Sequence, residues 1–167
     1  MRKKTLDKIY EEYARDVYRY LFSLSRDHGR AEDIMQETFY RAYLHIEKLN
    51  DEKIKPWLFR VAHNAFIDQK RKSQRETIKE RGYFEQEMSD MTSVEEHIIQ
   101  KEQVQSVFQS VDLLPTQQKE ALILTTIHQF NYLEAAGILN VSVSYLRILI
   151  FRARKTLRQR ERTGADE

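Results

Sequence analysis

Apolar residues recur every three or four positions along most of the chain, and this spacing predicts amphipathic helices. The first such segment runs from Thr5 to Ser25, with Thr5 as its N-terminal cap, and the second runs from Arg30 to Leu49. A third begins near Pro56, because a proline in the first helical turn loses no hydrogen bond. No segment sustains the alternation of apolar and polar residues that is typical of strands. The pattern therefore predicts an all-α protein.

Helical periodicity is lost over residues 73–93, which are rich in charge and poor in aliphatic side chains. Such a composition favours a flexible linker with at most transient helix. Helical spacing resumes between Ser93 and Val111, where Ser93 can cap the new helix. We therefore expect two small helical domains, residues 1–75 and 94–167, joined by a flexible linker over residues 76–93.

A tight turn joins two amphipathic segments between Asn131 and Leu157. Asn140 tolerates the left-handed backbone that ends a helix, and Ser142 can cap the N-terminus of the next helix. The second segment, residues 143–162, carries seven Lys/Arg and one acidic residue, which suits the phosphate-lined groove of DNA. This pattern predicts a helix-turn-helix, although an ordinary helical hairpin with a solvated basic face has the same spacing.

Charge is segregated along the chain, although the formal net charge is only +2. Residues 53–81 carry nine Lys/Arg and three acidic residues, and residues 82–112 carry one lysine and seven acidic residues. The basic second helix of the predicted helix-turn-helix follows them. Two separated cationic segments indicate two contacts with one polyanion.

Composition argues against several other functions. The 167 residues include no cysteine, which excludes disulfides, thiolate metal sites and a cysteine nucleophile and is typical of a reducing compartment. No apolar run approaches the roughly 20 residues that span a bilayer, and no signal-peptide core follows the N-terminus, so we expect a cytoplasmic protein. The five histidines are dispersed without a metal-spaced His/Glu pair, and no nucleophile–base constellation is present. We therefore expect no enzymatic activity, no metal site and no cofactor.

Three further stretches carry a resemblance to a known family. They are AEDIMQETFYRAY at 31–43, KPWLFRVAHNAFIDQKRK at 55–72 and LLPTQQKEALIL at 113–124, in this order ahead of the helix-turn-helix. The chain resembles an extracytoplasmic-function (ECF) sigma factor, a small two-domain promoter-specificity subunit of bacterial RNA polymerase, over nearly all of its length. The resemblance implies a protein that binds core RNA polymerase and promoter DNA and has no small-molecule substrate. It also implies control by an anti-sigma factor, often membrane-bound.

The resemblance implies that the helix carrying the acid-Gln-Glu motif docks on the clamp coiled coil of the polymerase. The matching residues share a polar face opposite the apolar stripe of their helix: Asp33, Gln36, Glu37, Tyr40 and Arg41. Alternatively, this polar face is exposed to solvent and binds no partner.

In the family, the third helix and the loop before it melt and read the upstream edge of the minus-ten promoter element. The basic and polar residues that match this region are Lys53, Lys55, Arg60, His63, Asn64, Lys70, Arg71 and Lys72. We expect Arg60, His63 and Asn64 to be exposed and to contact bases or backbone, while the basic cluster that follows holds phosphates. Trp57 has the chemistry to stack on a base, but an early-helix tryptophan beside Leu58 is more often structural, and we expect that role.

The second helix of the helix-turn-helix reads the minus-thirty-five element in the family. The matching residues are Ser142, Ser144, Tyr145, Arg147, Ile148, Arg152, Arg154 and Lys155. The chain departs from the family pattern at residues 148–151, where Ile-Leu-Ile-Phe replaces a more polar run. We expect Ile150 to join the core, Ile148 to contact DNA, and Leu149 with Phe151 to form an exposed interface with an anti-sigma factor or polymerase. The alternative is that Phe151 packs on the preceding helix.

A second function is compatible with a helix-turn-helix. A stand-alone transcriptional repressor or activator would use the N-terminal domain to bind a ligand or to dimerise. The acid-Gln-Glu and Trp-Leu-Phe-Arg motifs argue against this function, and co-purification with core polymerase distinguishes the two.

Overall fold

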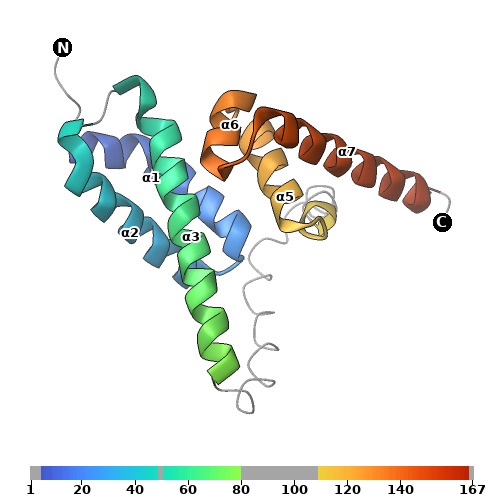
Figure 1. The fold of residues 1–167 in the computed structure, drawn as a ribbon, viewed down its shortest axis with the longest axis horizontal. Helices are drawn as coiled ribbons and strands as arrows, with labels where there is room; N and C mark the ends of the chain where they lie inside the picture. The colour runs from blue at the N-terminus through green and yellow to red at the C-terminus, as the bar shows by residue number, and fades with distance from the viewer. Residues whose placement is uncertain (1–4, 49–50, 80–108, 166–167) are drawn as a thin grey trace. The chain divides into compact units, whose positions relative to one another are not determined.

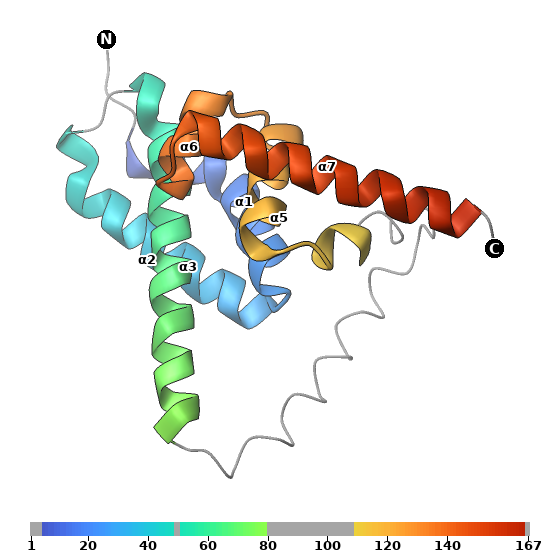
Figure 2. The same ribbon diagram turned by 45° about the vertical axis from the view of Figure 1, so that its right-hand side comes forward.

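The computed structural model describes residues 5–48, 51–79 and 109–165 (Figures 1 and 2). The elements in these ranges are α1 (Leu6–Ser25), α2 (His28–His45), α3 (Ile54–Lys79), α5 (Thr116–Leu122), α6 (Tyr132–Leu139) and α7 (Val143–Ala165), with short 3₁₀ turns at Ile46–Lys48 and Asp51–Lys53 and a π-helical turn at Ile123–Ile127. The chain divides into two compact units, Met1–Val94 and Glu95–Glu167. The prediction of an all-α protein is confirmed.

Local hydrogen bonds set the ends of the first two helices. The hydroxyl of Thr5 accepts a hydrogen bond from the first turn of α1, as the sequence predicts. The helix ends at Arg26, whose φ of 54° lies in the left-handed region. Asp27 Oδ1 then accepts from the backbone N–H of Arg30 at 3.1 Å. This turn lets α2 begin at His28, two residues earlier than predicted.

The helices α1, α2 and α3 pack against one another around a single core. Its buried apolar side chains come from all three helices: Ile9, Val17, Tyr20, Leu21, Ala31, Ile34, Phe39, Ala42, Ile54, Leu58, Phe59, Ala62, Ala65 and Phe66. The rings of Tyr20 and Phe59 lie 5.1 Å apart between α1 and α3. Burying each large apolar side chain stabilises the unit by about 1.5–3 kcal/mol, so this core fixes the two outer faces of α2 and α3.

The third helix is longer than predicted. It continues to Lys79, so residues 73–79 are helical and the expectation of at most transient helix is wrong for them. The C-terminal turns of α3 extend beyond α1 and α2 in both views (Figures 1 and 2). Once a helix is nucleated in the core, each added residue gains a hydrogen bond, which explains why a polar segment without periodicity continues it. The rest of the predicted linker, and most of the helix predicted from Ser93, lie outside the described residues.

In the second unit, α7 packs against both α5 and α6. The buried apolar side chains of these helices include Ala121, Ala135, Ala136, Ile138, Leu139, Leu146, Leu149, Ile150 and Ala153. Small residues on α6 allow its backbone to approach α7 closely. Lys119 of α5 is also buried, and its ammonium group lies 2.8 Å from the carboxylate of Asp112. The second unit therefore presents α7 on a platform built by two other helices.

Candidate nucleic-acid and protein interfaces

The outer face of α2 carries the polar residues that the sequence assigned to polymerase docking. Asp33, Gln36, Glu37 and Tyr40 are all exposed, whereas Ile34 and Thr38 on the opposite face are buried. Thr38 satisfies its buried hydroxyl by donating to the carbonyl of Ile34 at 2.7 Å. The predicted division of α2 into a core face and a polar outer face is confirmed for these residues.

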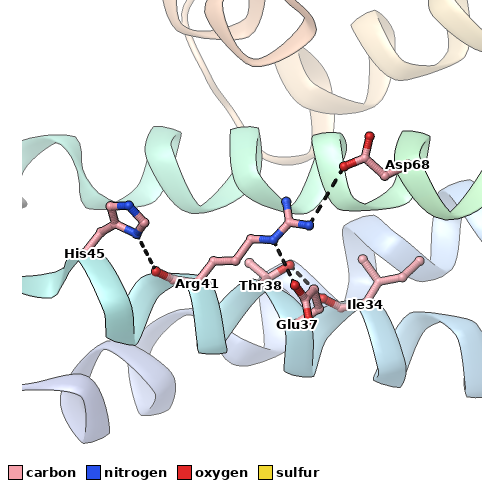
Figure 3. Close-up of polar contacts among 6 residues, drawn as sticks. All are labelled: Ile34, Glu37, Thr38, Arg41, His45 and Asp68. Carbon is pink, nitrogen blue, oxygen red and sulfur yellow. Dashed lines mark hydrogen bonds and ion pairs between the residues drawn. The ribbon is translucent and has the colours of Figure 1, made fainter.

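Arg41 differs from the other four candidate docking residues because its side chain lies between two helices. Figure 3 shows its guanidinium group reaching from α2 toward α3. Its Nε lies 3.0 Å from Glu37 Oε1 and its Nη2 lies 3.8 Å from Asp68 Oδ2. Such partly exposed pairs contribute about 0.2–1 kcal/mol each, so their main effect is on orientation. Arg41 orders the carboxylate of Glu37 and links this face of α2 to α3.

An apolar extension of this face was missed in the sequence. Leu44 is 58% exposed and lies four residues after Tyr40, which is 59% exposed, so both side chains follow the same stripe. Tyr43, whose position in the helical period places it toward the core, is exposed as well. The spacing of Leu44 from Glu37 and Tyr40 in the sequence could have revealed this exposure. An apolar residue on the polar stripe of a helix is unusual and indicates a contact surface.

On α3, several of the predicted minus-ten contacts share one exposed face. Arg60, Asn64 and Arg71 are exposed and are spaced four and seven residues apart, which aligns them along the helix. Lys70 and Lys72 are exposed beside Arg71, and Lys53 is exposed in the 3₁₀ turn before the helix. Lys55 is less accessible than these residues, because its side chain is half-buried. Trp57 is half-buried too, with its ring 6.1 Å from that of His45.

The prediction that His63 is exposed is wrong. Its side chain is only 8% exposed, and its Nδ1 lies 3.4 Å from the hydroxyl of Tyr20. Packing between helices causes this burial. His63 follows Phe59 by four residues, so both side chains lie on the face of α3 that α1 covers. Burial lowers the pKa of His63 from 6.5 to about 4, so the imidazole is neutral at physiological pH. His63 is therefore part of the core and does not share the exposed face of α3 with Arg60 and Asn64.

The buried imidazole predicts a pH-dependent stability. An unfolded histidine titrates near pH 6.5, whereas the folded His63 stays neutral down to about pH 4. The unfolded chain thus binds the extra proton, and stability is lost as the pH falls from about 6.5 to about 4, by on the order of 3 kcal/mol. His63→Gln removes this titration while keeping a polar partner for Tyr20. Thermal unfolding between these pH values should show a smaller decline for the variant; an equal decline would contradict the assignment.

The helix-turn-helix has the geometry expected of its class. Its two helices, α6 and α7, are bent by 97° across residues 140–142, within the range of DNA-binding helix-turn-helix motifs. Asn131 and Glu134 form a reciprocal capping box at the start of α6. Asn140 ends α6 in the left-handed conformation, with φ of 56°, and Ser142 Oγ accepts from the N–H of Tyr145 to cap α7. The predicted roles of Asn140 and Ser142 in the turn are confirmed.

Seven of the eight predicted minus-thirty-five contacts lie on α7 itself, and all seven are exposed: Ser144, Tyr145, Arg147, Ile148, Arg152, Arg154 and Lys155. Ser142 is exposed in the turn. The hydroxyl of Tyr145 donates to Gln117 Oε1 of α5 at 3.1 Å, so this ring is held against the platform. The exposed set combines cations for phosphates with polar and apolar groups for base edges.

The prediction that Leu149 is exposed is wrong. Leu149 is 3% exposed, whereas Phe151 is 68% exposed and Ile148 is also exposed. Because α5 and α6 both cover α7, its buried stripe is wider than one neighbouring helix would require. Leu149 therefore belongs to the core with Ile150, and only Ile148 and Phe151 remain available to partners.

A pair of substitutions checks this correction. Leu149→Gln is expected to lower the free energy of unfolding by about 3 kcal/mol, because it removes apolar packing and buries an amide. Phe151→Gln should change it by less than about 0.5 kcal/mol, because the ring is exposed. Chemical denaturation measures both values. Similar values for the two variants would show that the two side chains are not differently buried.

Two other classes of site are absent from the described part of the chain. Within residues 5–48, 51–79 and 109–165, no three His, Asp or Glu side chains are grouped so as to hold a metal ion. In the same ranges no single helix is long and apolar enough to cross a membrane, and only α6 and α7, taken together across their bend, meet that description by length and composition.

Comparison with known proteins places this architecture in one family. Residues 9–76 match Sigma-70 region 2, and residues 105–157 match Sigma-70, region 4. The chain is 38% identical to the ECF RNA polymerase sigma factor SigM of Bacillus subtilis (strain 168), covering 98% of this chain and 99% of SigM. It is 30% identical to SigX of the same strain, covering 94% and 84% of the two chains. The chain belongs to the ECF sigma factor family.

Solved structures share the fold. The sigma factor RpoE, in a co-crystal structure with the anti-sigma factor NepR from Bartonella quintana, has a TM-score of 0.74 and 25% identity, covering 92% of this chain and 94% of that one. CnrH, solved in complex with the cytosolic domain of CnrY, has a TM-score of 0.65 and 21% identity, covering 97% and 89% of the two chains.

Proposed function

We propose that this ECF sigma factor binds core RNA polymerase and directs it to specific promoters, with residues 1–75 docking on the polymerase clamp and reading the minus-ten element and residues 94–167 reading the minus-thirty-five element. One observation carries the proposal: the chain is 38% identical to SigM across nearly the full length of both proteins. The presence of an exposed cationic surface in each compact unit supports it, because the two surfaces suit two contacts with one DNA molecule.

Docking on polymerase is assigned to the exposed face of α2. Asp33, Gln36 and Glu37 supply the polar contacts, while Tyr40 and Leu44 add an apolar contact at the end of the same stripe. An interface of this kind combines an apolar centre with a polar rim. Arg41 acts chiefly by orienting Glu37, since its guanidinium group already pairs with that carboxylate.

Promoter contacts are divided between two helices. Asn64 and Arg60 on α3 have donors and acceptors suited to unpaired bases, and the exposed cluster Lys70 to Lys72 holds phosphates. On α7, Arg147 lies in the first turns of a helix-turn-helix recognition helix, where side chains reach base edges in the major groove. The cations from Arg152 to Lys155 contribute phosphate contacts.

Control by an anti-sigma factor is part of the proposal. It is supported by the similarity to RpoE, which was solved with the anti-sigma factor NepR. We assign the protein to the cytoplasm, where polymerase and promoter DNA are present. The chain carries no reaction of its own in this function, because the polymerase supplies the catalytic site.

A binding experiment tests the proposal. Each unit offers few DNA contacts, so the free protein should bind promoter duplex weakly and the complex with core polymerase should bind it tightly. Electrophoretic mobility measurements with and without core enzyme, at one fixed salt concentration, compare the two states. Tight sequence-specific binding by the free protein, unchanged by core enzyme, would indicate a stand-alone repressor or activator instead.

A further inference from the structure

One carboxylate interrupts the cationic face of α3. Between residues 54 and 75 this helix carries one acidic residue, Asp68, and six cations: Lys55, Arg60, Lys70, Arg71, Lys72 and Arg75. Asp68 follows Asn64 by four residues and precedes Lys72 by four, so it lies between two proposed DNA contacts. Its side chain is 60% exposed. A negative charge at this place opposes the binding of phosphates by its neighbours.

Arg41 of α2 supplies the opposite charge. Figure 3 shows its guanidinium group reaching from α2 to the carboxylate of Asp68 on α3. Its Nη2 lies 3.8 Å from Asp68 Oδ2, and in the described part of the chain no other cation lies within ion-pair distance of this carboxylate. The charge of Asp68 is thus compensated from the neighbouring helix, and Lys72 keeps its own charge for a phosphate.

Two further contacts hold Arg41 in this position. Its Nε lies 3.0 Å from Glu37 Oε1, and its backbone carbonyl accepts a hydrogen bond from His45 Nδ1 at 3.0 Å. A guanidinium group has five N–H donors in a rigid plane, so one arginine serves two carboxylates at once. Arg41 is therefore already placed beside Asp68 before any DNA is bound.

We propose that Arg41 is a positioning residue of the DNA site on α3 and acts by neutralising Asp68. Because the proposed function already places DNA phosphates on α3, this inference rests on it in that one respect. The role is separate from the orientation of Glu37, and the sequence assigned Arg41 to polymerase docking alone. Without Arg41, the carboxylate of Asp68 would face the phosphates uncompensated. Two like charges about 4 Å apart in water repel each other by an energy that corresponds to about a fivefold loss of binding.

The test measures DNA binding at α3 alone, without polymerase. The full chain carries a photo-crosslinking amino acid in place of Gln74, which is exposed on α3. The probe is a labelled single strand of about 20 thymidines at low salt, and the DNA concentration for half-maximal crosslinking is measured. Arg41→Met should raise this concentration by about fivefold. Adding Asp68→Asn to Arg41→Met should return it to within about twofold of the starting value.

Two control variants separate this role from others. Glu11→Gln, added to Arg41→Met, restores the net charge at an exposed carboxylate of α1 and should not restore crosslinking. Arg41→Lys keeps the positive charge and should keep binding within about twofold of the starting value. Recovery in the Arg41→Met, Asp68→Asn protein also excludes misfolding as the cause of the defect in Arg41→Met.

Three outcomes would overturn the proposal. Unchanged crosslinking in Arg41→Met would show that DNA does not sense the charge of Asp68. No recovery on adding Asp68→Asn would show that Arg41 contacts DNA itself or acts only through Glu37. Equal recovery with Glu11→Gln would show that net charge alone determines binding. Because crosslinking is measured without polymerase or promoter, failure of this role is distinguishable from failure of promoter-directed transcription.

Discussion

Replacing Gln36 and Glu37 together with alanine is expected to weaken capture of core polymerase by at least about tenfold, without changing the thermal stability of the protein. Both side chains are exposed on α2, and neither contributes to the buried face that holds the helix in place. The loss of the Glu37–Arg41 pair removes an interaction of only about 0.2–1 kcal/mol, so it does not account for a binding defect of this size.

A pull-down with purified core enzyme measures the effect, and Glu11→Ala is the matched control. Glu11 is an exposed carboxylate on a different helix, α1, and is not among the proposed contacts, so its loss changes net charge without removing one of them. Undiminished capture by the double variant would remove these residues from the docking site. A similar loss in Glu11→Ala would show that overall charge, rather than the face of α2, determines binding.

Asn64→Ala and Arg147→Ala are expected to fail at different steps of initiation. Asn64 is assigned to the melted minus-ten element, so its loss should reduce open-complex formation on duplex DNA, while a pre-melted template restores initiation. Arg147 is assigned to the upstream duplex, and loss of a bidentate base contact costs about 1–3 kcal/mol, or roughly 5- to 150-fold in binding. A pre-melted template should therefore not restore initiation by Arg147→Ala.

Permanganate reactivity on duplex templates and abortive transcription on pre-melted templates together provide the contrast. Gln74→Ala and Arg162→Ala are the matched controls, since both side chains are exposed on the same two helices and outside the proposed contacts. Identical responses of Asn64→Ala and Arg147→Ala to the pre-melted template would contradict the division of labour between α3 and α7.

The features that the sequence predicted correctly depend on local interactions. Thr5, Asn140 and Ser142 each act through hydrogen bonds or backbone conformations within one turn, and a residue type is enough to identify them. The outer face of α2 was predicted for a similar reason. Over the first turns of α2, from Ala31 to Thr38, apolar and polar residues separate on a helical period, so Asp33 and Gln36 could be placed outside without any knowledge of the neighbouring helices.

The features that were missed depend on how many helices cover a face. His63 and Leu149 both lie at the margin of an apolar stripe, and each is buried because its helix is packed against two others. Periodicity within one helix does not reveal the width of the covered face. The helical extension to Lys79 was missed because its sequence has no helical period of its own and it continues from a core-anchored helix.

Promoter-directed transcription in vitro tests the central claim most directly. Purified core polymerase, which lacks promoter specificity on its own, would be combined with this protein and a library of promoter sequences, and the transcripts would be sequenced. The account predicts transcripts that start downstream of a shared pair of upstream elements, and only when the protein is present. Transcription that is unchanged by the protein, or that is repressed wherever the protein binds DNA, would contradict its assignment as a sigma factor.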